Sequence, residues 1–222
     1  MSWNVVSLAD VVATPWRNGG GVTRELVAWP PEGEWQWRMS VAEVEASGPF
    51  SRFEGVQRWF AVLSGAGVAL DVAGERHTLT AESEPLAFDG AAPTDCQLLK
   101  GATQDFNLMV RGPGARAAVR SAQVKEEPAK RAGDTEQNVL TSSLPAETTA
   151  TEPRMQRITQ PTCFTANAPK VIAIWAINTW ATARFDSEII KIPSQSLAWR
   201  LFEHAAEVTL ETDAALWMEI PQ

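Results

Sequence analysis

Short segments in which apolar and polar residues alternate dominate the first 110 residues, and turn-forming residues separate them. Residues 35–42 alternate in this way, and residues 59–63 form a brief apolar run that ends at the glycine-rich turn 64–67. A period of two is typical of a half-buried strand. Few segments keep a helical period for three turns, so we predict a mostly β chain.

The remainder of the chain divides into two parts. Residues 121–153 lose the apolar periodicity and are rich in Glu, Lys, Ala, Thr, Ser and Pro, which predicts a flexible linker with at most a short helix at 133–140. Short strands are then predicted at 171–177, 183–192, 197–202, 207–212 and 215–220. We therefore predict domains at 1–120 and 154–222, arranged as two stacked β barrels or one large sandwich.

Charge and hydropathy narrow the class of protein. The chain of 222 residues has a net charge of −8, which argues against binding to nucleic acid or an anionic membrane through a general positive field. The longest apolar run, 171–177, is far shorter than the roughly 20 residues of a membrane span. The first residues do not resemble a secretory signal, so we expect a cytoplasmic protein.

Cysteine and histidine are scarce. Cys96 and Cys163 are far apart and have no Cys or His at ligand spacing, so we expect buried thiols rather than a zinc site or a disulfide. His77 and His204 have no Ser or Cys at a spacing that suggests a nucleophilic triad.

Residues 16–25 place three consecutive glycines between Arg17 and Arg24. Cationic side chains beside a freely rotating backbone suit the binding of a small anionic group, with Asn18 and Thr23 as hydrogen-bonding groups. The alternative is a surface hairpin whose arginines are solvated. No Gly-Lys-Ser/Thr follows and the Gly-x-Gly-x-x-Gly spacing is absent, so the segment is not a phosphate-binding loop.

Five segments resemble the HutD/Ves family in order and spacing: residues 16–25, 37–42, 48–51, 88–90 and 105–109. The resemblance implies an all-β bicupin, with two cupin-like jelly-roll barrels in one chain, and an association with bacterial histidine utilisation. The second half resembles the family only as a plausible second cupin.

The resemblance also implies where a cupin metal site would lie. The usual glutamate position falls near Arg58, two histidine positions near Ser51 and Phe53, and the last histidine position at Pro93. Divalent transition metals need about three His, Cys or carboxylate ligands. We therefore predict neither a metal nor a cofactor in the N-terminal barrel.

Arginine at a former glutamate position favours a carboxylate ligand, because the guanidinium stays charged and matches a carboxylate with two hydrogen bonds. Four arginines belong to this barrel: Arg17, Arg24, Arg38 and Arg58. The alternative for each is a solvated position or an ion pair with a nearby carboxylate: Glu25, Glu43, Glu45 or Asp89.

Residues 105–109 alternate as a strand and place Asp105 and Asn107 on one face. These two side chains could position Arg58 or accept a ligand N–H, or they could form a structural pair. Ser51 could donate to a carboxylate. Asp89 and Asp105 are the candidates for an acid/base pair.

The leading hypothesis is a metal-free bicupin that binds a small carboxylate metabolite and acts as a sensor or modulator. The resemblance suggests urocanate, formylglutamate or formiminoglutamate. One alternative is a metal-independent isomerase or hydrolase acting on an acylated amino acid through Asp89, Asp105 or Asn107. The other is a protein-interaction module that recruits a partner through residues 121–153. A monomer or a homodimer is expected.

Overall fold

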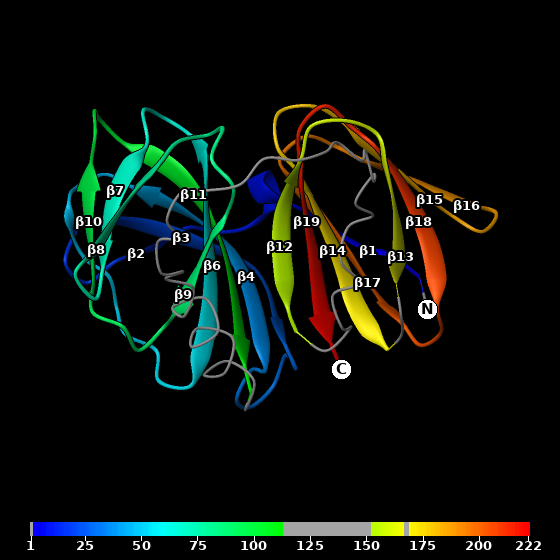
Figure 1. The fold of residues 1–222 in the computed structure, drawn as a ribbon, viewed down its shortest axis with the longest axis horizontal. Helices are drawn as coiled ribbons and strands as arrows, with labels where there is room; N and C mark the ends of the chain where they lie inside the picture. The colour runs from blue at the N-terminus through cyan, green and yellow to red at the C-terminus, as the bar shows by residue number, and fades with distance from the viewer. Residues whose placement is uncertain (1, 113–151, 167–168) are drawn as a thin grey trace, which may run out of the picture.

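The computed structural model describes residues 2–112, 152–166 and 169–222, and nearly all of its regular structure is β-strand (Figure 1). The strands up to residue 112 are β1 (Asn4–Ser7), β2 (Thr14–Pro15), β3 (Gly21–Trp29), β4 (Trp37–Val44), β5 (Gly48–Pro49), β6 (Val56–Ser64), β7 (Val68–Val72), β8 (Glu75–Leu79), β9 (Leu86–Asp89), β10 (Thr94–Leu98) and β11 (Thr103–Arg111). Those from residue 152 onward are β12 (Arg154–Ile158), β13 (Thr162–Ala166), β14 (Lys170–Ala176), β15 (Ala181–Phe185), β16 (Glu188–Ile192), β17 (Ser196–Phe202), β18 (Ala206–Glu211) and β19 (Ala215–Pro221). Within the described residues the one helical element is a short 3-10 helix, η1 (Leu8–Asp10). The prediction of a mostly β chain is therefore confirmed.

Each half of the molecule is a two-sheet antiparallel sandwich. The N-terminal half, β2 to β11, pairs a six-stranded sheet of order β2-β3-β4-β11-β6-β9 with a four-stranded sheet of order β5-β10-β7-β8. The C-terminal half pairs a five-stranded sheet, β1-β17-β14-β19-β12, with a four-stranded one, β13-β18-β15-β16. None of these sheets closes on itself within the described residues, so each cupin-like jelly roll takes the double-sheet form.

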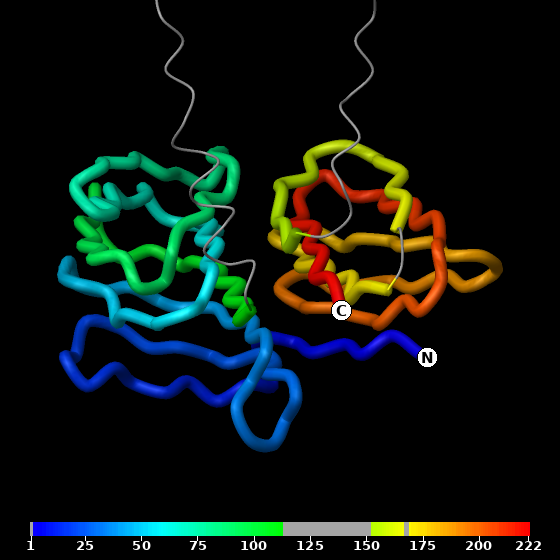
Figure 2. The backbone as a smooth tube through the Cα atoms, turned by 60° about the horizontal axis from the view of Figure 1, so that its bottom comes forward, coloured from blue at the N-terminus to red at the C-terminus, as the bar shows by residue number. Residues whose placement is uncertain are grey.

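The N-terminal strand crosses to the other half. β1 pairs with β17 from Asn4 opposite Trp199 to Ser7 opposite Ser196, and Figure 2 shows this segment leaving the first half to run beneath the second. Residues 4–7 therefore complete a C-terminal sheet, although the predicted domain 1–120 assigned them to the N-terminal barrel. The predicted linker 121–153 lies outside the described residues except for its last two, and the predicted helix at 133–140 lies wholly outside them.

Three apolar clusters hold the layers together. One fills the N-terminal sandwich, one fills the C-terminal sandwich, and the largest lies between the six-stranded and five-stranded sheets. Phe106 and Trp175 meet in this central cluster with their ring centroids 5.4 Å apart. The two halves therefore share a core, and burying such aromatic surface is a main source of stability.

Strands β6 and β14 are buried on both faces, which explains why their sequences are apolar runs rather than alternating ones. In β6, Trp59 and Ala61 enter the central cluster, whereas Phe60 and Val62 enter the N-terminal sandwich. The side chain two residues before Phe60 on the same inner face is Arg58, which is 5% exposed. The fold therefore places the Arg58 cation on the face of β6 that points into the N-terminal sandwich.

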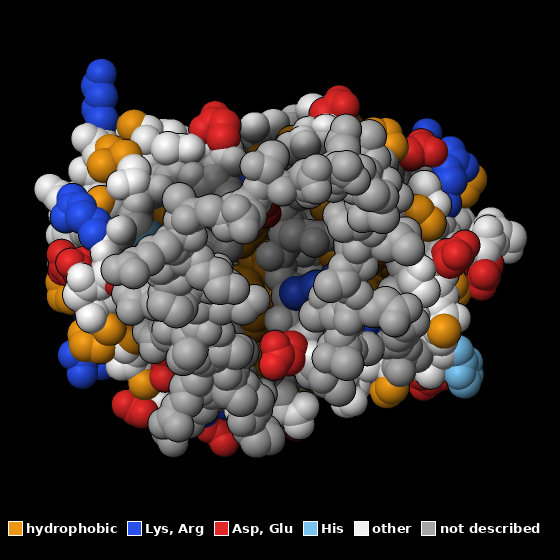
Figure 3. All heavy atoms as spheres, viewed as in Figure 1, with side chains coloured by type: hydrophobic (Ala, Val, Ile, Leu, Met, Phe, Trp, Pro, Cys, Tyr) orange, Lys and Arg blue, Asp and Glu red, His pale blue; other side chains and the backbone are white. Residues whose placement is uncertain are grey.

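On the face drawn in Figure 3, acidic and basic side chains of the described residues lie interspersed. Within the described part of the chain, no helix is long and apolar enough to cross a membrane.

Candidate functional site

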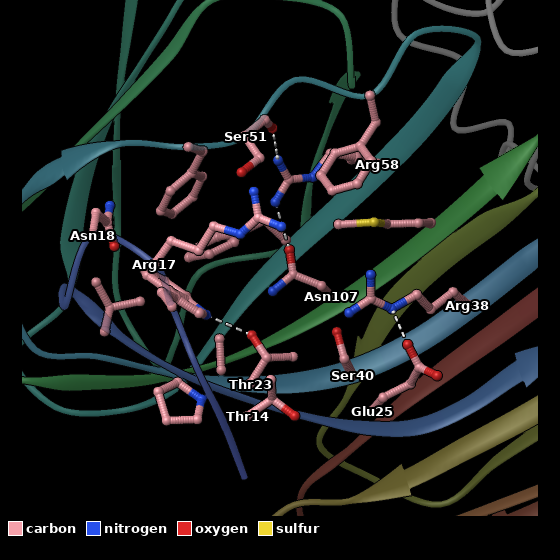
Figure 4. A pocket seen from close by; sticks show the side chains of 18 of the residues that line it. Thr14, Arg17, Asn18, Thr23, Glu25, Arg38, Ser40, Ser51, Arg58 and Asn107 are labelled. Atoms are coloured by element: carbon pink, nitrogen blue, oxygen red, sulfur yellow. Dashed lines mark hydrogen bonds and ion pairs between the residues drawn. The ribbon is translucent and has the colours of Figure 1, made fainter.

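A cavity of about 870 Å³ opens into the N-terminal sandwich, walled by β3, β4, β6, β11 and the segments before β3 and β6 (Figure 4). All but two of the ligand-binding residues expected from the sequence line this cavity: Arg17, Asn18, Thr23, Arg38, Ser51, Arg58 and Asn107. The exceptions are Arg24 and Asp105. Segments that are far apart in sequence thus contribute to one site.

Arg58 lies at the inner wall of the cavity. Its Nη2 donates to Asn107 Oδ1 at 2.9 Å, and its Nη1 lies 3.5 Å from the Ser51 carbonyl oxygen (Figure 4). The guanidinium carbon lies 5.0 to 5.7 Å from the centroids of three phenylalanine rings: Phe50, Phe53 and Phe88. The arginine is therefore held by neutral groups and aromatic faces.

No carboxylate forms an ion pair with Arg58 among the described residues. Burial, followed by the nearby positive charge of Arg38, lowers the pKa of Arg58 to about 10. The group still carries its charge at neutral pH, and its Nε has no hydrogen-bond partner. A buried charge without a counter-ion is costly, so this site favours an anion in the cavity.

The other two arginines of the cavity, Arg38 and Arg17, differ in whether a carboxylate pairs with them. Arg38 Nε lies 2.8 Å from Glu25 Oε2, so its charge is matched by a neighbour on β3. Arg17 is exposed and forms neither an ion pair nor a side-chain hydrogen bond within the described residues. Arg17 and Arg58 are therefore the cations whose charge remains available to a ligand.

The glycines of residues 16–25 build a hairpin between β2 and β3. Gly19 has a φ of +71°, and the Gly20 amide donates to Asn18 Oδ1 at 3.0 Å. A Cβ on Gly21 would lie 2.2 Å from the Glu43 carbonyl oxygen, so glycine permits the close approach of β3 to β4. The glycines thus shape the turn that carries Arg17, and the Asn18 side chain already serves that turn.

Hydroxyl groups and aromatic rings complete the lining. The Trp16 indole N–H donates to the Thr23 hydroxyl oxygen at 2.7 Å, which leaves the Thr23 hydroxyl proton free to donate. Ser40 and Glu25 also line the cavity but were not predicted as site residues. Ser40 could have been found, because strand alternation places it on the same face as Arg38.

Arg24 and Asp105 do not line the cavity. Arg24 forms an ion pair with Glu43, the structural alternative considered above. Asp105 is fully buried, and its Oδ2 accepts a hydrogen bond from the Thr103 hydroxyl at 2.8 Å while its Oδ1 has no partner. Burial raises the pKa of Asp105 to about 7, against a smaller lowering by Thr103.

Asp89 and Asp105 do not form the suggested acid/base pair. Their partners on β6 are Gln57 and Val62, which face opposite sides of the sheet. The Asp89 carboxylate instead accepts the Ala91 amide at 2.9 Å in a turn. The sheet therefore separates the two carboxyl groups.

The residues at the cupin metal positions do not fit a divalent metal. Ser51, Phe53 and Arg58 line the cavity together, whereas Pro93 lies outside it, beside the separate hollow near Asp71. Within the described residues, no group of three His, Cys, Asp or Glu side chains could hold a metal ion. A guanidinium in place of a ligand glutamate would also repel a cation.

Comparison of the sequence with known proteins identifies relatives. The HutD family model matches residues 8–183. An uncharacterized 21.2 kDa protein in the hutC 3′ region of Pseudomonas putida is 42% identical over 102 residues, which cover 45% of this chain and 54% of that protein. Protein Ves of Cronobacter sakazakii is 40% identical over 109 residues, 48% of this chain and 60% of that protein. The matches thus span little more than half the length of these curated relatives.

Comparison of the structure confirms the cupin fold class. HutD from Pseudomonas fluorescens SBW25 aligns with a TM-score of 0.72 at 24% identity, covering 100% of this chain and 99% of that one. Salicylate 1,2-dioxygenase from Pseudoaminobacter salicylatoxidans, a cupin protein, aligns with a TM-score of 0.61 at 10% identity, covering 99% of this chain and 81% of that one. Because the family model covers most of the chain, the chain belongs to the HutD family.

Proposed function

We propose that the N-terminal half binds a small carboxylate metabolite in its cavity and that the protein acts as a sensor or modulator of histidine utilisation. The observation that carries the proposal is Arg58: a buried, charged guanidinium without a carboxylate partner in the described structure, facing a cavity. A ligand carboxylate would supply the missing counter-ion with charge-assisted hydrogen bonds.

The form of the cavity supports a small organic ligand. Its volume of about 870 Å³ falls within the range of small-molecule sites, roughly 300–1,000 Å³. Trp16, Phe50 and Phe60 supply apolar walls, while Thr23 and Ser40 supply hydroxyl groups near the arginines. Arg17 offers a second charge, which suits a ligand with a second polar end.

Binding without turnover is favoured by the lining itself. Among the described residues of the cavity there is no His or Cys, and the carboxylate present, Glu25, is paired with Arg38. General acid/base catalysis needs a titratable group within reach of the ligand. The lining suits recognition better than proton transfer.

The family supplies the metabolic setting. The HutD family is linked to the histidine-utilisation locus, and the Pseudomonas putida relative is named for its place beside hutC. The carboxylates of that degradation are urocanate, formiminoglutamate and formylglutamate, which are the candidate ligands.

Isothermal titration of the full chain with these three compounds tests the proposal. We expect saturable binding of at least one, weakened about 100-fold or more by Arg58→Met, since removing one partner of a buried charge pair costs several kcal/mol. Arg24→Met is the matched control, because Arg24 is paired with Glu43 outside the cavity. The proposal fails if folded wild-type protein binds none of the compounds, or if both variants weaken binding equally.

A further inference from the structure

Strands β14 and β19 pair in the C-terminal half (Figure 1), and Lys170 of β14 is another buried cation. Lys170 Nζ donates to Glu219 Oε2 at 2.7 Å, and the two residues are 4% and 3% exposed. Glu219 Oε1 also accepts the Trp217 indole N–H at 2.9 Å and Arg154 Nε at 2.8 Å. The carboxylate is thus enclosed by donors.

This pair occupies the same place in its sandwich as Arg58 and Asn107 do in theirs. β14 lies between β17 and β19, as β6 lies between β9 and β11. Lys170 is opposite Phe202 on β17, and Arg58 is opposite Phe88 on β9.

The acceptors correspond as well. On β11 the residue opposite Arg58 is Met109, and Asn107 lies two residues before it. On β19 the residue opposite Lys170 is Pro221, and Glu219 lies two residues before it. In both halves the donor and its acceptor are separated by 49 residues. The two strand registers and the shared spacing therefore show that Lys170–Glu219 and Arg58–Asn107 occupy equivalent positions in the two halves of the fold.

The counterparts differ in charge. Glu219 is ionised: burial acts to raise its pKa, but hydrogen bonds from Lys170, Trp217 and Arg154 outweigh burial and hold the pKa below its usual value. Lys170 therefore has an internal counter-ion. Asn107 presents the same kind of oxygen to Arg58 without a charge, and a cavity lies beside it.

We propose that the chain contains two versions of one carboxylate site, closed in the C-terminal half by Glu219 and open in the N-terminal half because residue 107 is a neutral amide. Asn107 is then the specificity-determining residue, since it positions Arg58 without neutralising it. The open version rests on the proposed function, whereas the closed version stands on the Lys170–Glu219 contacts alone.

Asn107→Asp tests the open site, because aspartate keeps the shape of the side chain and adds the missing charge. We expect the variant to have a higher unfolding temperature than the wild type without ligand, and its affinity for formylglutamate and urocanate in titration calorimetry to fall about tenfold or more. Asn178→Asp is the control: it adds the same charge at an exposed position that does not line the cavity, and should leave both quantities nearly unchanged.

Equal effects of Asn107→Asp and Asn178→Asp on affinity and unfolding temperature would overturn the inference. So would an Asn107→Asp variant whose affinity and unfolding temperature match the wild type. If the wild type binds neither compound, the proposed function fails, but the rise in unfolding temperature still tests the role of Asn107.

Glu219→Ala tests the closed site by chemical rescue. The substitution removes the equivalent of an acetate ion from beside Lys170 and Arg154, so the unfolding temperature should fall. Added sodium acetate should restore it by roughly 3 °C or more beyond any rise in the wild type, because a ligand that binds only the folded state stabilises it. Acetamide, its neutral analogue, should not.

Equal effects of acetate and acetamide on Glu219→Ala would overturn the closed-site assignment. If this variant does not fold, Glu219→Gln keeps the shape and removes only the charge. Its unfolding temperature should lie several degrees below that of the wild type. An unchanged unfolding temperature would likewise contradict a counter-ion role for Glu219.

Discussion

Arg38 and Glu25 form an ion pair across strands β4 and β3 in the wall of the cavity, with 2.8 Å between Arg38 Nε and Glu25 Oε2. The carboxylate is half exposed, so the pair contributes little to stability. The pair instead affects the charge of the cavity, because Glu25 neutralises the positive charge of one of the three arginines that line it.

Glu25→Gln should therefore strengthen binding of a carboxylate ligand. The variant frees Arg38 while keeping the side-chain shape. For the carboxylate that the wild type binds most tightly, we expect the dissociation constant to fall by roughly two- to tenfold at low salt. Glu43→Gln, which frees Arg24 outside the cavity, is the control and should leave the constant nearly unchanged. Titration calorimetry at two salt concentrations measures both; weaker binding by Glu25→Gln would contradict the assignment.

Asp105 should make the protein less stable as the pH rises. Burial raises the folded-state pKa of Asp105 to about 7 from an ordinary value of 3.8, so the folded protein holds a proton that the unfolded chain releases. The free energy of unfolding should therefore fall between about pH 4 and pH 7 and level off above, by a few kcal/mol in total. The nearby Cys96 thiol does not titrate in this range, because burial, with a further contribution from Asp105, raises its pKa to about 12.

Asp105→Asn should remove this pH dependence. The amide stays neutral, so the variant should match the wild type at about pH 4 or below and exceed its stability at pH 8, as measured by urea unfolding. Asp95→Asn, at an exposed neighbouring position on β10, is the control and should keep the wild-type slope. A wild-type curve that is flat from pH 4 to 7 would show that Asp105 is ionised throughout.

Much of the fold is predictable from local sequence because each strand has its own signal. The apolar run 171–177 corresponds to β14, and most of the alternating segment 35–42 lies in β4. The predicted strand 183–192 is instead part of two strands, with Asp186 at a φ of +51° between them. Aspartate tolerates this conformation, but with no glycine nearby the turn has no strong signal.

The site was less predictable, because sequence alone does not fix which face of β3 is inward. Residues 23–25 are all polar, so no apolar alternation distinguishes Thr23 and Glu25, which line the cavity, from Arg24, which does not. The cross-half pairing of β1 has no local signal either, since register with β17 depends on tertiary packing.

Trp175 should be essential to the joint core of the two halves. It is fully buried and contacts Phe106 from the opposite half. Trp175→Ala leaves a large cavity between the sheets and should lower the free energy of unfolding by about 3–5 kcal/mol. Trp180→Ala, at an exposed tryptophan of the same half, should change it by about 0.5 kcal/mol or less in urea unfolding followed by circular dichroism. Similar losses for the two would contradict a shared core.

Gly21→Ala should damage the site through the backbone. The new Cβ would lie 2.2 Å from the Glu43 carbonyl oxygen, so β3 must move away from β4, and the adjoining turn carries Arg17. We expect a loss of about 2 kcal/mol or more in unfolding free energy together with weaker carboxylate binding. Gly48→Ala is the matched control, because nothing lies within 4 Å of a Cβ there, and it should change stability by less than about 1 kcal/mol. A Gly21→Ala variant as stable as Gly48→Ala would show that β3 and β4 accommodate the methyl group, and Arg17 would then keep its place in the cavity.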